Sequence, residues 1–178
     1  MRLFVAIGLP TPVAEALAQS ARSLIRPSPD AKIRWTPPAN MHITLSFLGQ
    51  VHEARLDIIL QALATIRARR LQLRLNGFST FDRAGVLYAD VKPAPALVSL
   101  ASQVVAAMEA IGFPREDRPY APHITLARTR ERLRTSLDRG RNDPAFHQSF
   151  DATEFRLYQS FTLPEGPRYD VLRTFPLD

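Results

Sequence analysis

Hydrophobic and polar residues alternate with two different periods along the first half of the chain. Segments with alternating or continuous apolar residues predict three short strands, at 2–9, 32–36 and 41–48. Segments with apolar residues at helical spacing predict two helices, from Val13 to about Ile25 and over 53–69. Thr11-Pro12 favours the start of the first helix, because proline is tolerated in the first helical turn.

The second half of the chain continues this mixture of strands and helices. Leu71, Leu73 and Leu75 alternate with polar residues, and a turn at 82–85 precedes a second apolar run, so that 71–91 predicts a β-hairpin. Further patterns predict a helix over 97–111, a strand at 122–128, a short helix at 130–139, and a final pair of strands at 155–161 and 169–175. The predicted fold class is therefore α+β.

One tetrapeptide occurs twice in this framework, each time in a predicted strand. His42-Ile43-Thr44-Leu45 recurs as His123-Ile124-Thr125-Leu126. Residues i and i+2 of a strand share one face, so each copy directs an imidazole and a hydroxyl to one side and two apolar side chains to the other. Histidine exchanges protons near neutral pH. Two such strands side by side would form a site with two proton-transfer centres.

The two copies occupy equivalent positions in an order of elements that both halves of the chain share. Each half of the chain has a helix, a proline-rich loop, the motif strand, a helix and paired strands. We therefore expect residues 1–178 to form a single bilobal domain with an internal duplication and pseudo-twofold symmetry. Each lobe would be an antiparallel sheet with helices on its outer face, and the motif strands would meet at a central cleft.

Charge and cysteine content narrow the chemistry. Basic residues outnumber acidic ones by 23 to 17, and all but Lys32 and Lys92 are arginines. This excess suits a polyanionic substrate, although a general use of arginine in place of lysine would explain it equally well. The chain has no cysteine, which excludes disulfides, thiolate zinc sites and thiol nucleophiles. Neither a signal-peptide pattern nor a segment of transmembrane length is present, so we expect a cytoplasmic protein that does not bind membranes. We also expect a monomer, although nothing in the sequence fixes the oligomeric state.

The residues around the two motifs carry a family resemblance. Residues 35–49, which read WTPPANMHITLSFLG, and residues 118–128, which read RPYAPHITLAR, resemble the two signatures of the 2H phosphoesterase superfamily. The opening residues 2–7 and the late Gly166-Pro167-Arg168-Tyr169 are similar to its RNA 2′,3′-cyclic phosphodiesterase family, once called 2′-5′ RNA ligase. The resemblance extends over essentially the whole chain.

This resemblance implies a bilobal fold with both histidines in the central cleft. It implies hydrolysis of RNA 2′,3′-cyclic phosphate ends, or of cyclic nucleotides, to a 2′-phosphomonoester without metal or cofactor. His42 would be the proton donor and His123 the proton acceptor, while Thr44 and Thr125 would hold the phosphate oxygens. The same site could join RNA ends through a 2′-5′ linkage as a side activity, with a 5′-hydroxyl in place of water.

Several other residues near the motifs allow two interpretations. Arg128 lies five positions after His123, and a regular strand would turn it to the opposite face. It is a phosphate ligand if the strand bends, and a structural ion-pair partner otherwise. We expect Phe47 to pack in the core, whereas base stacking and packing remain open for Trp35 and Tyr120. His52 and His147 lie outside the motifs, and we expect both at the surface.

Rival functions are distinguishable by the residues they require. A zinc hydrolase needs a third protein ligand near the two histidines, and the sequence offers none at a suitable spacing. A non-catalytic RNA-binding module would not need both histidines. Within the superfamily, the alternative substrates are 2′-5′ oligonucleotides and small cyclic nucleotides.

Overall fold

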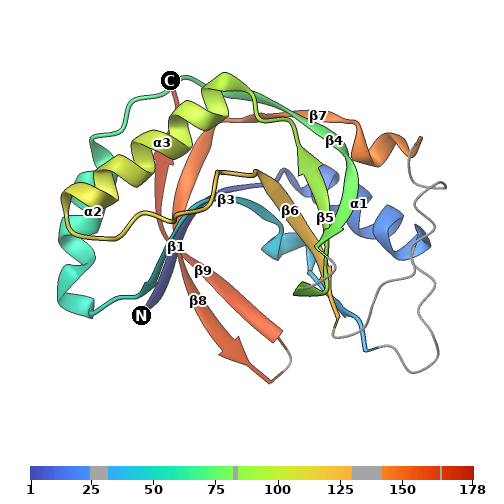
Figure 1. Ribbon diagram of the computed structural model, residues 1–178, viewed down its shortest axis with the longest axis horizontal. Coiled ribbons are helices and arrows are strands. Elements are labelled where there is room, and N and C mark those ends of the chain that lie inside the picture. The colour runs from blue at the N-terminus through green and yellow to red at the C-terminus, as the bar shows by residue number, and fades with distance from the viewer. Residues whose placement is uncertain (25–31, 82–83, 130–141, 165) are drawn as a thin grey trace.

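Nine antiparallel strands form the frame of the computed structural model, which describes residues 1–24, 32–81, 84–129, 142–164 and 166–178 (Figure 1). The strands are β1 (Arg2–Gly8), β2 (Arg34–Trp35), β3 (His42–Gln50), β4 (Leu71–Phe81), β5 (Val86–Val91), β6 (His123–Arg128), β7 (Ser149–Ala152), β8 (Glu154–Leu163) and β9 (Gly166–Pro176). The α-helices of the described ranges are α1 (Thr11–Leu24), α2 (Leu56–Ala64) and α3 (Pro95–Ala110). Short 3₁₀ helices lie at Pro38–Asn40, Glu53–Arg55 and Pro144–Phe146. The predicted α+β class is confirmed.

The order of strands across the sheet is β7-β4-β5-β6-β3-β1-β8-β9, and β2 pairs with β6. Four strands of this order lie on each side of the boundary between β6 and β3. The two sheets expected from the sequence are joined by one residue pair, Ile43 of β3 opposite Ile124 of β6. An internal duplication would produce such an arrangement, and the duplication itself stays a prediction.

The two halves of the sheet exchange elements of the sequence. The β4–β5 hairpin follows the first motif along the chain but pairs with the second motif strand, β6. The final β8–β9 hairpin follows the second motif but joins the first motif strand through β1. Helices cross over in the same sense, because α1 contacts β6 and α3 contacts β3. Neither half of the sequence therefore completes one lobe alone.

The core lies between the helices and one face of the sheet. Ile43 and Leu45 of β3, and Ile124 and Leu126 of β6, are buried in it with apolar residues of α1, α2 and α3. Full burial of each such side chain contributes about 1.5–3 kcal/mol to stability. The helices thus hold the apolar side of both motifs and leave the alternate residues on the other face. In Figure 1 the β8–β9 hairpin extends away from α2 and α3.

Both motif strands contain a β-bulge at the same position. In β3, Thr44 pairs with Ala6 and Ser46 pairs with Val5, which leaves Leu45 as the extra residue. In β6 the same irregularity falls at Leu126, between residues paired with consecutive positions of β5. Because side chains alternate from face to face, one extra residue reverses the face of everything that follows. Residues five positions after each motif histidine therefore share its face.

The second helix is shorter than its apolar pattern predicts. The expected range was 53–69, but α2 ends at Ala64. The backbone of the next segment has other partners, since the Arg70 N–H donates to the carbonyl of Asp178 and the Asp178 N–H donates to that of Ala68. These bonds join the segment to the end of the chain, so it cannot continue the helix.

The remaining differences are small or lie outside the described ranges. Strand β2 has two residues where five were expected, and β8 and β9 are longer than predicted, whereas the hairpin of β4 and β5 has the predicted bounds. Strand β7 was missed because a four-residue strand gives too little alternation to recognise. The helix predicted at 130–139 lies outside the described residues. No helix of the described ranges is long and apolar enough to cross a membrane.

Candidate active site

The four polar motif side chains form a compact array on the sheet face opposite the helices. The pairing of Ile43 with Ile124 sets the register, so that His42 lies beside Thr125 and Thr44 beside His123. The two histidines are therefore diagonal neighbours on opposite sides of the array. In a regular ladder the Cα atoms of such neighbours are about 7–8 Å apart, which leaves room for one small group between the two imidazoles.

Each imidazole is held by a hydrogen bond to the backbone carbonyl two residues earlier. His42 Nδ1 lies 2.7 Å from the carbonyl oxygen of Asn40, and His123 Nδ1 lies 2.8 Å from that of Ala121. A carbonyl can only accept, so each Nδ1 carries the proton and donates it. In the neutral rings Nε2 is then the basic atom, and in the protonated rings Nε2–H is the acid. Each histidine thus presents one nitrogen for proton transfer.

Aromatic side chains surround His42 on the first side of the site. Its ring centroid lies 4.8 Å from that of Phe4 and 5.3 Å from that of Tyr169, and the Phe4 ring also stacks on Tyr158 at 5.0 Å. Burial lowers the pKa of His42 below its ordinary value of 6.5. The bond to the Asn40 carbonyl opposes this shift, while positive charges on His123 and Arg128 lower the pKa further.

The surroundings of His123 differ in shape and charge. Its ring makes edge contacts with Phe81 and Tyr88, with centroids 5.4 and 5.5 Å away. The residue opposite His123 on the neighbouring strand is Asp90, whereas the residue opposite His42 is Gly8. Asp90 accepts a hydrogen bond of 2.9 Å from the side chain of Asn76. The site is therefore symmetric in its histidines and threonines and asymmetric in their neighbours.

Arg128 is brought to the site face by the bulge at Leu126. It is exposed, and it shares this face with His123 and Thr125. Its charge acts on the first side of the site as well, because it lowers the pKa of both His42 and Tyr169, whose pKa burial raises. Within the described ranges, the ion pairs are Arg156 with Glu154 and Arg168 with Asp170, so Arg128 is not held in one there. Since the bulge turns Arg128 to the site face, its role as a phosphate ligand stays a prediction.

Comparison with known proteins gives this site a family. The family model described as LigT like Phosphoesterase matches residues 7–88 and 90–169, so one motif lies in each matched segment. The chain belongs to this family. The resemblance to 2H phosphoesterases seen in the sequence is therefore confirmed.

Relatives of this LigT-like phosphoesterase match over nearly its full length. It is 31% identical to the RNA 2′,3′-cyclic phosphodiesterase of Archaeoglobus fulgidus, over 98% of this chain and 99% of that one. It is 34% identical to the enzyme of the same name from Thermus thermophilus, over 99% and 90% of the two chains. The crystal structure of E. coli LigT complexed with 3′-AMP superposes with a TM-score of 0.86, at 29% identity, and covers 99% of this chain and 97% of that one.

Two bonds secure the segments that precede the motif strands of this phosphoesterase. The Asn40 side chain donates to the carbonyl of Pro167 in the β8–β9 hairpin, at 2.8 Å. Asn40 thereby fixes the carbonyl that holds His42. The Tyr120 hydroxyl donates to the backbone carbonyl of Thr44, at 3.1 Å, and so connects the loop before the second motif to the strand of the first.

The structure places the three aromatic residues that lie near the motifs in the sequence. The expected core position of Phe47 is wrong, because the bulge at Leu45 turns it to the site face, where it is 56% exposed. Trp35 packs partly buried against the core, with the Arg22 guanidinium 5.7 Å from its ring centre. Tyr120 is also partly buried against the core, so Trp35 and Tyr120 both contribute to packing.

Sequence reasoning missed the aromatic walls around the histidines. Phe4, Tyr169, Phe81 and Tyr88 lie on strands distant from the motifs along the chain, and only the register brings them to the site. His52 and His147 are exposed, as expected. The His52 side chain accepts the N–H of Ala54 and caps a 3₁₀ helix, which is a role in local structure.

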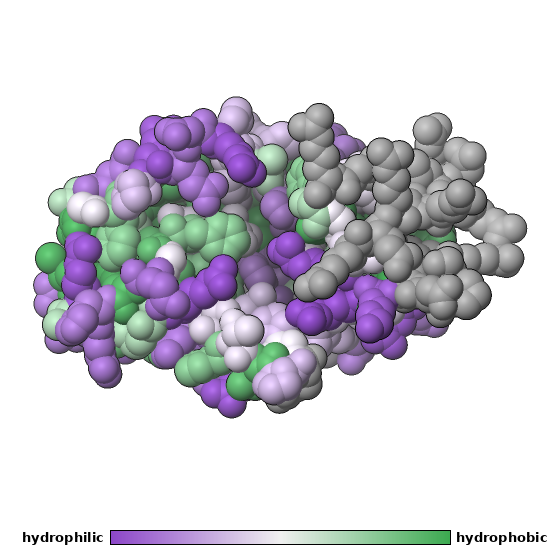
Figure 2. All heavy atoms as spheres, turned by 60° about the horizontal axis from the view of Figure 1, so that its bottom comes forward, coloured by the Kyte–Doolittle hydropathy of each residue, from purple (hydrophilic) through white to green (hydrophobic). Residues whose placement is uncertain are grey.

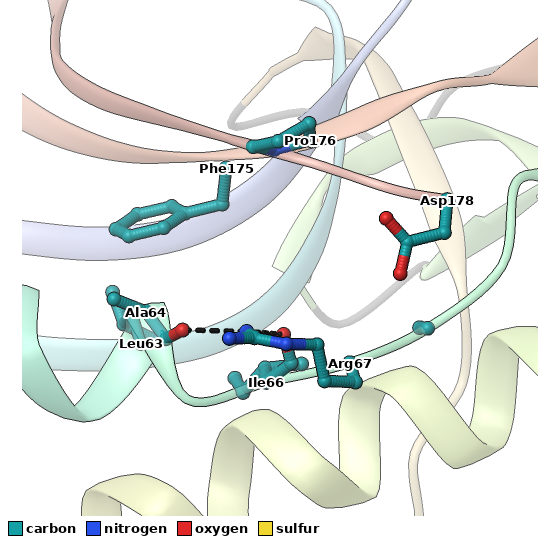
Figure 3. Close-up of a pocket in the computed structure, with 8 residues that line it drawn as sticks. Leu63, Ala64, Ile66, Arg67, Phe175, Pro176 and Asp178 are labelled. Carbon is teal, nitrogen blue, oxygen red and sulfur yellow. Dashed lines mark hydrogen bonds between the residues drawn. The ribbon is translucent and has the colours of Figure 1, made fainter.

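A separate pocket lies away from the two motif strands. A pocket of about 300 Å³ between the end of α2 and the end of β9 is lined by Leu63, Ile66, Arg67, Phe175 and Asp178 among others (Figure 3). The Arg67 guanidinium is turned back to the carbonyls of Ala64 and Ile66. Figure 2, in which the bottom of Figure 1 comes forward, shows a recess near the middle of that face, with hydrophilic residues on its walls.

No group of three or more potential metal ligands occurs within the described ranges.

Because the pKa of His42 is lowered in the folded protein, we expect protonation of this residue to reduce the free energy of unfolding in acid. The unfolded chain binds a proton at His42 below pH 6.5, whereas the folded protein resists it. Since the unfolded state then binds more protons, the free energy of unfolding falls as the pH drops from 6.5 to the folded pKa. Thermal unfolding between pH 8 and pH 5 should show a smaller loss of stability in His42→Gln than in wild type. Equal losses of stability in the two proteins would contradict the lowered pKa of His42.

Proposed function

We propose that this protein hydrolyses 2′,3′-cyclic phosphates at RNA ends to 2′-phosphomonoesters, with His42 as proton donor and His123 as proton acceptor. The observation that carries the proposal is the diagonal pair of histidines, each with Nδ1 bonded to a carbonyl and Nε2 available. Relatives named RNA 2′,3′-cyclic phosphodiesterase, matched over nearly the whole chain, support the choice of substrate.

The two imidazoles would act together, one as base and one as acid. Water attacks phosphorus and transfers a proton to Nε2 of His123, while the bond from phosphorus to the ribose 3′-oxygen breaks. Nε2–H of His42 gives its proton to that leaving oxygen, and the phosphate remains on the 2′-oxygen. Attack and departure take place on opposite sides of phosphorus, which suits two imidazoles at opposite corners of the array.

The negative charge of the substrate would favour the protonated form of the donor, His42. In the free protein, burial and the nearby positive charges favour the neutral form of His42. A bound phosphate places negative charge between His42 and Arg128 and so favours the protonated form. The donor would therefore acquire its proton together with the substrate rather than before it.

The remaining polar groups would bind the phosphate oxygens. Thr44 and Thr125 offer hydroxyl donors on either side of the array, and Arg128 offers a planar fork that matches phosphate geometry. The exposed ring of Phe47 offers a flat surface to a base. A 5′-hydroxyl in place of water would make the reverse-type 2′-5′ ligation a side activity.

Loss of either histidine should abolish most of the activity. His42→Ala and His123→Ala should each lower kcat by at least about a hundredfold, since each removes one arm of acid–base catalysis. The assay is hydrolysis of 2′,3′-cyclic AMP and of short RNA ending in a cyclic phosphate, with 3′,5′-cyclic AMP and 2′-5′ linked dinucleotides as comparison substrates. His52→Ala is the matched control and should retain wild-type rates. Near-normal turnover in either motif variant would refute the roles proposed here.

Removal of metal should leave the rate unchanged. The proposed chemistry needs only imidazole, hydroxyl and guanidinium groups, so exhaustive dialysis against EDTA should not lower kcat. Elemental analysis of the dialysed protein accompanies the assay. Activity that disappears with the chelator and returns with zinc or manganese would require a different mechanism.

The product should be a single positional isomer. If the donor His42 stands beside the 3′-oxygen, that oxygen leaves and the phosphate stays at the 2′ position. The unequal neighbours of the two histidines favour one orientation of the substrate over the other. Phosphorus NMR of the product formed from 2′,3′-cyclic AMP separates 2′-AMP from 3′-AMP. A clean 3′-phosphate would reverse the proposed placement of the leaving oxygen.

A further inference from the structure

A second arginine lies directly beside Arg128, on the strand that fills the gap between the two halves of the sheet. Strands β3 and β6 meet at Ile43 and Ile124, and further along the same edge β6 pairs with β2. In this short ladder Arg34 is opposite Arg128 and Trp35 is opposite Ala127. Strand β2 thus begins at the site and occupies the place from which β3 has diverged.

The register also decides which way Arg34 points. Residues directly opposite each other in a ladder share a face, so Arg34 lies on the face of Arg128, His123 and Thr125. The neighbouring residue confirms this, because Trp35 packs against the core and its partner Ala127 is buried. Arg34 itself is exposed. It is therefore a surface arginine on the site face.

Two arginines facing each other across a ladder repel one another, since like charges in this position are destabilising. Neither arginine belongs to an ion pair of the described ranges. A lysine would place a point charge there, whereas two guanidinium forks provide paired donors for planar recognition of phosphate oxygens. Such a pair is stabilised when an anion with more than one phosphate lies across it.

We propose that Arg34 binds the internucleotide phosphate that precedes the terminal nucleotide of the RNA. This inference rests on the proposed function, in which Arg128 takes the cyclic phosphate. The two arginines would then hold two consecutive phosphates of one strand. The protein would distinguish an RNA end, which has both phosphates, from a mononucleoside cyclic phosphate, which has one.

The experiment compares substrates that differ only at that second phosphate. They are a nucleoside 2′,3′-cyclic phosphate, a dinucleotide ending in a 2′,3′-cyclic phosphate, and the same dinucleotide with an uncharged methylphosphonate linkage. The variants are Arg34→Gln and, as a matched control, Arg69→Gln. Arg69 is an exposed arginine between α2 and β4, in the segment bonded to the end of the chain. Circular dichroism and thermal unfolding establish that each variant folds as wild type.

Arg34→Gln should lower kcat/KM for the normal dinucleotide about tenfold, as expected for loss of a hydrogen bond to a charged group. The loss should be less than about twofold for the methylphosphonate and for the mononucleoside. The dependence of log kcat/KM on log salt should become shallower by about 0.7 for the normal dinucleotide, which corresponds to one phosphate contact. Arg69→Gln should change none of these values.

Two results for Arg34→Gln would overturn the inference. Equal losses of kcat/KM on all three substrates would place Arg34 at the terminal phosphate. No loss of kcat/KM on any substrate would show that Arg34 does not bind the RNA. If wild type hydrolyses none of the substrates, the proposed function fails separately. In that case, titration of wild type and Arg34→Gln with a dinucleotide ending in a 2′-phosphate decides the matter. Tighter binding by wild type that disappears with the methylphosphonate linkage supports the role of Arg34, and equal binding refutes it.

Discussion

The pairing of Ile43 with Ile124 is the contact on which the rest of the site depends. It is the one residue pair between β3 and β6, and it sets the register in which each histidine lies beside the threonine of the other motif. A slip by one residue would turn the polar side chains of one strand into the core. The helices prevent such a slip, because each motif strand is covered by a long helix from the other half of the sequence.

The symmetry of this frame is broken by the residues it brings to the site. Equivalent bulges turn Phe47 and Arg128 to the same face, one apolar and one charged. Equivalent neighbours of the histidines are Gly8 on one side and Asp90 on the other. A symmetric array alone could hold phosphate in either of two orientations. The charge of Arg128, which lowers the pKa of His42, distinguishes the two sides. Under the proposed function it would give the substrate a direction.

The sequence predicted the components of the site better than their arrangement. The repeated motif identified the four central side chains, since strand alternation is a local rule that neighbouring residues satisfy by themselves. It did not predict that Arg128 would share their face, because a bulge depends on the partner strand. The exchange of hairpins between lobes and the early end of α2 escaped prediction for the same reason. Each is determined by hydrogen bonds to segments that are remote along the chain, such as the bond from Arg70 to Asp178.

The charges around His42 indicate what kind of ligand would suit the site. Without a ligand, the site gathers the two histidines, Arg128 and Arg34 on one face, and the carboxylate opposite His123, that of Asp90, accepts a hydrogen bond from the Asn76 amide. The positive charges oppose protonation of His42, as the direction of its pKa shows. Under the proposed function, a bound phosphate would remove this opposition, because its negative charge would lie among the same groups. The substrate would then take part in setting the protonation of the pair, and a neutral ligand of the same shape could not do so.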